Sequence, residues 1–291
     1  MGSEMCIRDS SCLPKRSRRH VPAAMAMRWA SALSEPQPEW SDALAQAVER
    51  LDWVEEESPP GLAFLFVSQA FASSLKELMA AATRELSPNA LVGVVGAGVL
   101  ADGRELDSGE GALGVLAGSL PVGTAVRPFV MGGESLPVWS QLFGEAEAGR
   151  PGFLLFADPF SPILQAIECL DLAWPSSVVA GGLSCPTNQA SPSLALYTKG
   201  AAPRVLPIGS VVGLGIRGPH FELHSAVAQG AIGVGRSFVV TAGEDETVAE
   251  LDGVPALARL QEVVDEVKSD ERIVRLLSLI HISEPTRRTP I

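Results

Sequence analysis

LAFLFVSQAFASSLKELMAAATRELSPNALVGVV, residues 62–95, reads as a complete β-α-β unit. Its first seven residues form an apolar run with two phenylalanines, which is typical of a buried strand. Residues 73–86 then carry apolar side chains at helical spacing, with a serine cap at the start and Glu77 near the capping-box position. Ser-Pro-Asn ends this helix, and residues 90–95 are the next buried run. Connections this short predict that the two strands pair in parallel.

The same order of elements recurs in the second half of the chain. Residues 153–159 are an apolar run that predicts a strand. Residues 161–174 predict a helix with Ser161 as its cap and Pro162 at its first position. Residues 176–182 predict another strand, which ends in glycine.

Two further segments, 111–120 and 209–218, also resemble one another in their mixture of glycine and branched apolar residues. We therefore expect an α/β fold of mixed sheets with flanking helices, built by internal duplication of a β-α-β-β unit. The two copies cover roughly 62–131 and 153–218. The alternative is that unrelated α/β segments share this character without any duplication.

The segments around these copies complete the expected fold. Residues 39–54 predict an amphipathic helix, and residues 221–230 and 236–244 alternate like antiparallel strands. The last predicted helix, 254–267, places four apolar residues along one face that needs a partner. These residues are Leu257, Leu260, Val264 and Val267.

The two ends of the chain share an unusual relationship. Codons that encode residues 2–10 give, on the opposite DNA strand, the sequence LSLIHISEPT of residues 277–286. We therefore expect 1–10 and 277–291 to be translated sequencing-adapter DNA that takes no part in the fold. The natural protein is then expected to be longer than this fragment.

The leader that follows, residues 11–26, is basic and free of acidic residues. It is either untranslated sequence that has been read through or the end of an organellar transit peptide, for example a plastid one. In the second case VPAAMA, 21–26, is the cleavage region, and the mature chain begins at Met27.

Composition limits the partners and the compartment. The 291 residues include 34 acidic and 22 basic ones, a formal net charge of −12, which disfavours nucleic acid and anionic membranes. No apolar run approaches the roughly 18–20 residues that a membrane helix needs. Only Cys169 and Cys185 lie beyond the leader, so no disulfide framework is expected. These features predict a soluble cytoplasmic protein.

Two glycine patterns resemble dinucleotide-binding motifs, but their surroundings do not fit. GAGVLA, 96–101, follows a strand yet precedes a polar loop instead of a helix, and GLGIRG, 213–218, precedes Pro219. Glycines in such places permit tight turns. His220 and His224 are four residues apart in a stretch that reads as a strand, too far apart to chelate a metal. We expect no cofactor and no metal.

The best polar candidates follow predicted strands. Asp158 comes at the carboxyl end of one strand, and Ser184 and Cys185 follow Gly181 and Gly182 at the end of another. Ligands of open α/β sheets bind outside such strand ends. Two alternatives remain: Asp158 caps backbone amides, or Ser184 or Cys185 is a nucleophile.

Six strings between residues 27 and 268 resemble, in order and spacing, the FIST family of F-box and intracellular signal transduction proteins. They are MRWASALS, LAFLFVS, LVGVVGAGVLADGRELDSGEGALGVLAGSLP, FLLFADPFS, VVAGGLS and VAQGAIGVGRSFVVTAGEDETVAELDGVPALARLQEV. The resemblance implies a FIST N-terminal domain over 27–249 and the truncated start of a FIST C-terminal domain over 250–276. No kinase, cyclase, methyl-accepting or F-box segment is visible, so the stand-alone form is expected.

The resemblance also implies a function. Family members are sensory proteins whose N-terminal domain binds small ligands such as amino acids, so we expect a non-enzymatic sensor with a signalling partner. Matching positions include Asp158 to Ser161, Gly181-Gly182 and Gln229-Gly230. Members often carry Cys-Arg-Pro-Ile-Gly after the Gln-Gly, whereas this chain has Ala-Ile-Gly-Val-Gly at 231–235. That departure implies a different ligand or a loss of binding.

We therefore expect an amino-acid site where the loops after Val95, Ala157 and Ala180 converge. Glycine amides would meet the ligand carboxylate, and Asp158 would accept from its amino group. The expected ligand-binding residues are Gly96, Gly98, Asp158, Ser161, Gly181, Gly182, Ser184, Gln229 and Gly230. The alternatives are a small-metabolite enzyme that uses Asp158 with Ser184 or Cys185, and a protein-interaction scaffold.

Overall fold

The chain divides into two compact units, 1–225 and 226–291. The computed structural model describes residues 27–53, 59–107, 109–132, 142–143, 149–175, 177–188, 191–226, 236–244 and 247–268. Both adapter-like ends and the leader lie outside these residues, as do Gln229 and Gly230. The predictions made for them, and the predicted domain boundaries, stay predictions.

A six-stranded mixed sheet forms the centre of the first unit, in the order β1-β6-β2-β3-β10-β11. The strands are β1 (Trp29–Leu33), β6 (Leu113–Gly118), β2 (Leu62–Ser68), β3 (Ala90–Gly96), β10 (Leu194–Thr198) and β11 (Arg204–Val205). β2 and β3 are parallel and the other neighbours are antiparallel. The parallel pair predicted from residues 62–95 is confirmed.

A four-stranded sheet, in the order β7-β12-β8-β9, packs face to face against the first sheet. The strands are β7 (Ala125–Met131), β12 (Val211–Arg217), β8 (Gly152–Ala157) and β9 (Val178–Leu183). Only β8 and β9 pair in parallel. Order and direction repeat those of β1-β6-β2-β3, which is the arrangement that an internal duplication predicts; the duplication itself stays a prediction.

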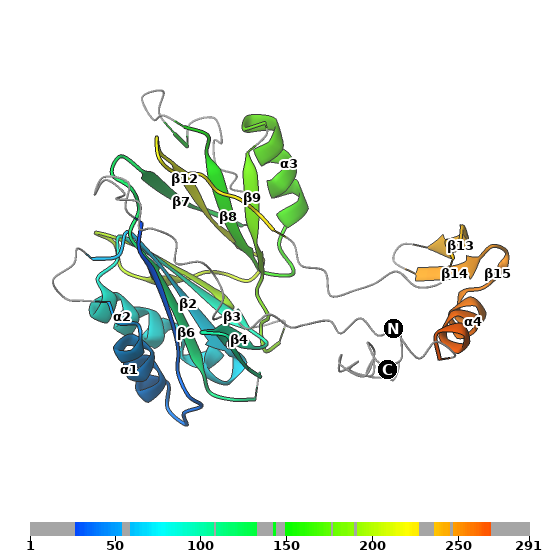
Figure 1. The fold of residues 1–291 in the computed structure, drawn as a ribbon, viewed down its shortest axis with the longest axis horizontal. Helices are drawn as coiled ribbons and strands as arrows, with labels where there is room; N and C mark the ends of the chain where they lie inside the picture. Colours follow the sequence, from blue (N-terminus) through cyan, green and yellow to red (C-terminus); the bar gives the residue numbers. More distant parts are fainter. Residues whose placement is uncertain are drawn as a thin grey trace, which may run out of the picture. The chain divides into compact units, whose positions relative to one another are not determined.

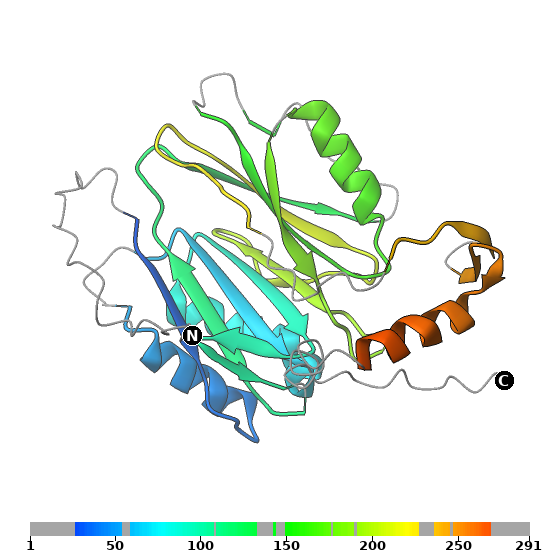
Figure 2. The same ribbon diagram turned by 45° about the vertical axis from the view of Figure 1, so that its right-hand side comes forward.

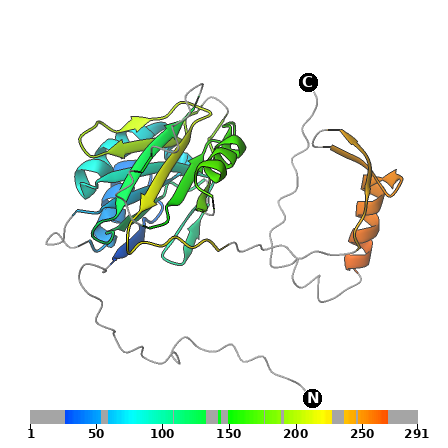
Figure 3. The ribbon, with the colours of Figure 1, turned by 90° about the horizontal axis from the view of Figure 1, so that it is seen from above.

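Three helices enclose the two sheets, which gives four layers (Figure 1). α1 (Trp40–Arg50) and α2 (Leu75–Leu86) pack on the outer face of the six-stranded sheet. α3 (Ile163–Ala173) packs on the outer face of the four-stranded sheet. The layers can be followed from two further directions (Figure 2, Figure 3). The α/β class of mixed sheets with flanking helices is confirmed.

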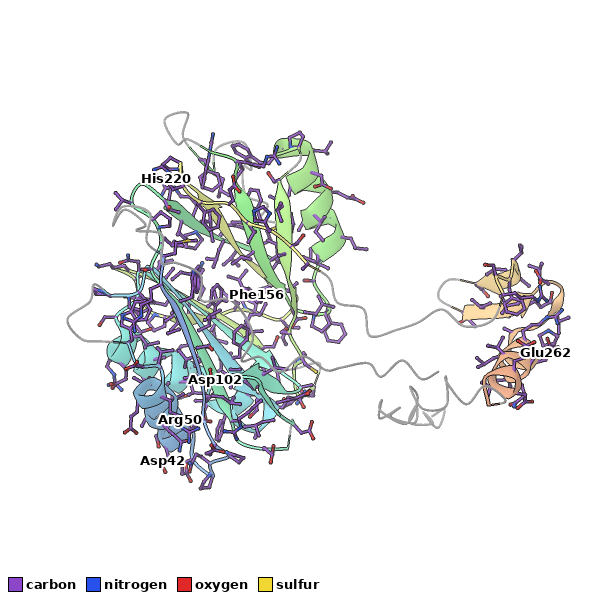
Figure 4. The ribbon with its side chains drawn as sticks, in the orientation of Figure 1. Asp42, Arg50, Asp102, Phe156, His220 and Glu262 are labelled. Atoms are coloured by element: carbon purple, nitrogen blue, oxygen red, sulfur yellow. The ribbon has the colours of Figure 1, made fainter. Side chains whose placement is uncertain are left out.

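Aromatic and branched side chains fill the space between the two sheets. Phe64 on β2 and Phe156 on β8 have ring centroids 5.6 Å apart, and Phe156 lies between the sheets in Figure 4. Such tilted aromatic pairs add to the free energy gained by burying apolar area. The inner faces of both sheets are therefore apolar, which explains why their strands read as nearly continuous hydrophobic runs.

The helix starts differ from the predicted ones. α3 begins at Ile163 and Pro162 is its N-cap, so Ser161 is not the cap. A 3₁₀ turn, η3 (Gln69–Ser74), precedes α2, and Ser74 makes no capping hydrogen bond with its side chain. In both places a short turn separates the strand from the helix, and the serine lies in that turn, so its side chain does not cap the helix.

A hairpin, and no helix, follows β3, as the polar loop after GAGVLA indicated. Its strands are β4 (Val99–Ala101) and β5 (Arg104–Leu106). A Cβ atom at Gly96 would lie 2.8 Å from the Gly98 carbonyl oxygen, so a glycine fits this tight turn. None of the helices in the described ranges is long and apolar enough to cross a membrane.

The second unit contains a small antiparallel sheet and one helix. Its elements are β13 (Val240–Glu244), β14 (Thr247–Leu251), β15 (Val254–Pro255) and α4 (Ala256–Lys268). The helix predicted at 254–267 is confirmed. The strand predicted at 221–230 is wrong for 221–226, which joins none of the described sheets, and the one predicted at 236–244 begins only at Val240.

Candidate functional site

The carboxyl ends of β8 and β9 bring two polar residues together. Ala157 is paired with Leu183 at the end of the parallel ladder, so Asp158 and Ser184 are the next residues on neighbouring strands. The Ser184 amide donates to the Ala157 carbonyl at 2.8 Å, which holds the two strand ends in register. The ends of β8 and β9 therefore lie side by side, although β9 runs past Ala180 to Leu183, and the predicted convergence of the loops on one pocket stays a prediction.

Ser193 joins these two residues into a chain of hydrogen bonds. Its Oγ lies 3.1 Å from Asp158 Oδ2 and 2.7 Å from Ser184 Oγ. A carboxylate can only accept, so the single hydroxyl proton of Ser193 points to Asp158. The Ser184 hydroxyl then has two acceptors within reach, Ser193 Oγ at 2.7 Å and the Ala157 carbonyl at 3.2 Å. Because all three residues are buried, this small network has few competing water molecules.

The segment between β9 and β10 connects the network to the six-stranded sheet. The Cys185 amide donates to the Val95 carbonyl at 2.8 Å, and the Val95 amide donates to the Ser193 carbonyl at 2.9 Å. Gln69 Nε2 donates to the Cys185 carbonyl at 3.1 Å. Residues 184–193 therefore run from one sheet to the other and are bonded at both ends.

Asp158 fills one of the two roles that the sequence left open, the backbone cap, and its role in ligand binding stays a prediction. The Phe160 amide donates to its Oδ1 at 3.0 Å, which is a local backbone cap. Its Oδ2 accepts from Ser193, and the residue is only 1% exposed. Both oxygens thus have protein donors, and because the residue is buried a ligand ammonium would reach this carboxylate only if the surrounding structure opened.

The predicted glycines lie at the same end but serve different purposes. Gly181 has a φ of +149°, and a Cβ atom there would lie 1.7 Å from the Leu155 carbonyl oxygen, so the strand ladder itself requires glycine. Gly182 has open space around the position of a Cβ atom. Gly96 and Gly98 shape the turn into the β4–β5 hairpin.

One further predicted site residue, Ser161, lies next to the network. The Ser161 amide donates to the Asp158 carbonyl at 2.9 Å, while its hydroxyl is buried and has no partner within the described structure. Ser161 therefore adjoins the network without joining it.

A cavity of about 430 Å³ opens beside the connecting segment. Its polar lining comes from Gln69, Ser73, Lys76, Thr187 and Ser191. Lys76 is exposed and forms no ion pair with any described residue, so its ammonium can bind an anion. Gln69 lines the cavity and also touches Cys185, so it links the cavity to the network.

Sequence reasoning missed the residues that complete this site. Ser193 stands directly before the apolar run of β10, and Gln69 directly after that of β2, which are strand ends like those that pointed to Asp158. The missing information was that β10 pairs with β3, antiparallel, in the first sheet. This antiparallel pairing places the amino end of β10 beside the carboxyl ends of β2 and β3.

Two mycobacterial proteins are similar in sequence to this chain. It is 29% identical over 214 residues to "Uncharacterized protein Rv0628c" of Mycobacterium tuberculosis, a match that covers 73% of this chain and 54% of that protein. It is 28% identical over 235 residues to "Uncharacterized protein Mb0898c" of Mycobacterium bovis, covering 79% and 58%. The chain thus matches little more than half the length of these relatives.

The family model for the FIST N domain matches residues 61–254, which is more than half of the chain and includes both parallel strand pairs of the first unit. FIST domains are sensory domains of signal transduction. The resemblance identified in the sequence is therefore confirmed: this chain belongs to the FIST family.

Proposed function

We propose that this chain is the ligand-binding part of a sensory protein, and that its ligand is a small polar metabolite, with an amino acid as the best candidate. One observation carries the proposal: the 430 Å³ cavity lies against the segment that joins the two sheets. A cavity of this volume is in the range of small-molecule sites. The proposed role is non-enzymatic and uses no cofactor.

The lining offers a group for each end of an amino acid. The Lys76 ammonium is a partner for the carboxylate. Gln69 uses its Nε2 to donate to Cys185, which leaves Oε1 to accept from the ligand's ammonium. The hydroxyls of Thr187 and Ser191 add donors and acceptors on the opposite wall.

The signal is proposed to travel through the connecting segment. Thr187 and Ser191 belong to the stretch between Cys185 and Ser193, which is hydrogen-bonded to both sheets. A ligand held by these two residues changes the free energy of the Ser184–Ser193–Asp158 network. Asp158 and Ser184 then act as positioning residues.

A binding screen tests the proposal. We expect at least one amino acid to raise the unfolding temperature, with a gain of about 2.7 kcal/mol at 100 times its Kd. Lys76→Gln removes a charge-assisted hydrogen bond and should weaken binding by about tenfold or more. Arg84→Gln, a substitution of an exposed arginine outside this cavity, is the matched control. If no amino acid stabilises the chain, the proposal fails.

Asp158→Asn separates direct contact from positioning. A positioning role predicts lower stability without ligand, because an asparagine has one acceptor oxygen and so either the Phe160 amide or the Ser193 hydroxyl loses its acceptor. The gain on adding ligand should then be unchanged. Direct contact with the ligand ammonium predicts that the gain is lost as it is in Lys76→Gln.

The enzyme alternative has one observation in its favour. The Ser184 hydroxyl can pass its proton through Ser193 to the Asp158 carboxylate, which is the arrangement of an activated nucleophile. Ser184 is only 4% exposed, so substrate access requires the segment to open. Hydrolysis of activated esters that disappears in Ser184→Ala, and persists in Cys185→Ala, would establish this alternative.

Charge and thiols complete the proposal. The formal net charge of −12 argues against nucleic acid and anionic membranes as partners. Cys169 and Cys185 are free thiols, which suits the cytoplasm. The output partner of the sensor is then a protein.

A further inference from the structure

A second and larger cavity lies at the opposite end of the strands. It measures about 590 Å³ and is bounded by Gly61 before β2, Asn89 before β3 and Lys199 after β10. The start of β7, including Arg127, and the turn before it form the remaining wall. Because β2 and β3 are parallel, their amino ends meet here, far along the strands from Asp158.

The charge of this cavity is opposite to that of the chain. Lys199 and Arg127 both line it, and no aspartate or glutamate is among the described lining residues. The Lys199 ammonium forms no ion pair with a described residue. Arg127 has a further interaction within the structure, so the Lys199 ammonium is the cation that attracts small anions to this cavity.

Uncharged donors accompany the two cations. The Thr124 hydroxyl is buried, has no partner within the described structure and belongs to a lining residue. This hydroxyl lies next to Gly218 and is closed to solvent, so a ligand in the cavity reaches it only if the turn moves. The Asn89 amide group, which makes no hydrogen bond to a described residue, and the Thr198 hydroxyl add further donors.

The backbone around these donors is fixed. The Lys199 amide donates to the Asn89 carbonyl at 2.8 Å, and the Asn89 amide donates to the Pro60 carbonyl at 2.9 Å. The Thr124 amide donates to the Pro121 carbonyl at 3.1 Å, which closes the turn on the other side. The donors therefore stand on a scaffold held in place before any ligand arrives.

We propose that this cavity is an oxyanion site, which binds a small metabolite through a carboxylate or a phosphate group. Lys199 supplies the charge, with Arg127 on the β7 wall, and Asn89 and Thr198 supply neutral donors. The proposal is independent of the amino-acid site, because the two cavities share no lining residue.

Calorimetric titration of the full chain with inorganic phosphate, and separately with succinate, tests this site. Binding of either anion supports the proposal, and the tighter of the two identifies the group that is recognised. Lys199→Gln and Arg127→Gln should each raise the Kd of that anion by about tenfold or more. Arg84→Gln, a substitution of an exposed arginine that lines neither cavity, should leave its Kd unchanged. Because Lys199 is exposed, its substitution should leave the circular dichroism spectrum unaltered.

Three results would overturn the proposal: dissociation constants above about 10 mM for both anions, binding that survives in Lys199→Gln and Arg127→Gln, and binding that is lost in Lys76→Gln instead. The amino-acid screen is read separately. If no amino acid binds but phosphate or succinate does, the proposed sensory site is wrong and the oxyanion site is still supported.

Discussion

At the scale of single residues, the sequence located one half of the network. Asp158 and Ser184 were predicted because each follows a buried run, and parallel strand ends meet. Ser193 was not, because its partners lie 35 and 9 residues away and depend on a strand that crosses to the other sheet. Local patterns identify strand ends, but they do not reveal which distant end comes to lie beside them.

Removal of the Ser193 hydroxyl should destabilise the fold. Ser193→Ala leaves Asp158 Oδ2 and the Ser184 hydroxyl without their shared partner in a buried place, so we expect a loss of about 1–3 kcal/mol in the free energy of unfolding. Urea denaturation followed by circular dichroism measures it. Ser73→Ala, an exposed serine, should change stability by less than about 0.5 kcal/mol. Equal effects of the two substitutions would show that the network contributes no stability.

At the scale of elements, periodicity predicted the strands and helices of the first unit well, but the helix starts less well. A serine before an apolar period predicts a cap, yet the chain turns first at Ser74 and at Ser161. Strand β1 was missed because WASAL, residues 29–33, is short and mixed in character, and its pairing with β6 determines it. Such edge strands depend on tertiary contacts more than on propensity.

Adjacent glycines in β9 offer a matched test of the ladder. Gly181→Ala puts a methyl group against the Leu155 carbonyl at a backbone angle that other residues rarely adopt. We expect it to lower the free energy of unfolding by about 3 kcal/mol or more. Gly182→Ala meets nothing within 4 Å and should be nearly neutral. Guanidinium unfolding curves of both variants decide the matter, and a neutral Gly181→Ala would contradict the β8–β9 register.

An exposed ion-pair cluster makes stability depend on pH. Hydrogen bonds from Arg104 and then Arg50 lower the pKa of Glu35 from 4.5 to about 2. Because the folded-state pKa is lowered, the contribution of Glu35 is present above its ordinary pKa and is lost as the pH falls toward 2. The stability difference between the natural chain and Glu35→Gln should therefore be constant near neutral pH and shrink below about pH 4.5. Glu105→Gln is the control, and unfolding curves across this range measure both.

At the scale of the whole molecule, the sequence predicted the layers but not how they meet. A sheet whose strands are apolar on both faces needs another layer packed against each face. The helices pack only against the outer faces. The inner faces therefore pack on one another, through residues such as Phe64 and Phe156. Nothing local in the sequence distinguishes this pairing of two sheets from a single larger sheet.

The second unit leaves an apolar helix face in contact with water. Leu257 and Leu260 of α4 are 77% and 57% exposed, and exposed apolar area is unfavourable by about 25 cal/mol per Å². We expect the chain to bind a hydrophobic dye such as ANS and to aggregate as its concentration rises. The double substitution Leu257→Glu and Leu260→Glu should suppress both effects with little change in the unfolding curve. Ala258→Glu adds charge to the same helix while removing little apolar area, so it should leave dye binding nearly intact. If the double variant binds dye as strongly as the natural chain, the apolar surface that binds the dye lies elsewhere. The exposed leucines of α3, Leu164 and Leu172, are then the next residues to substitute.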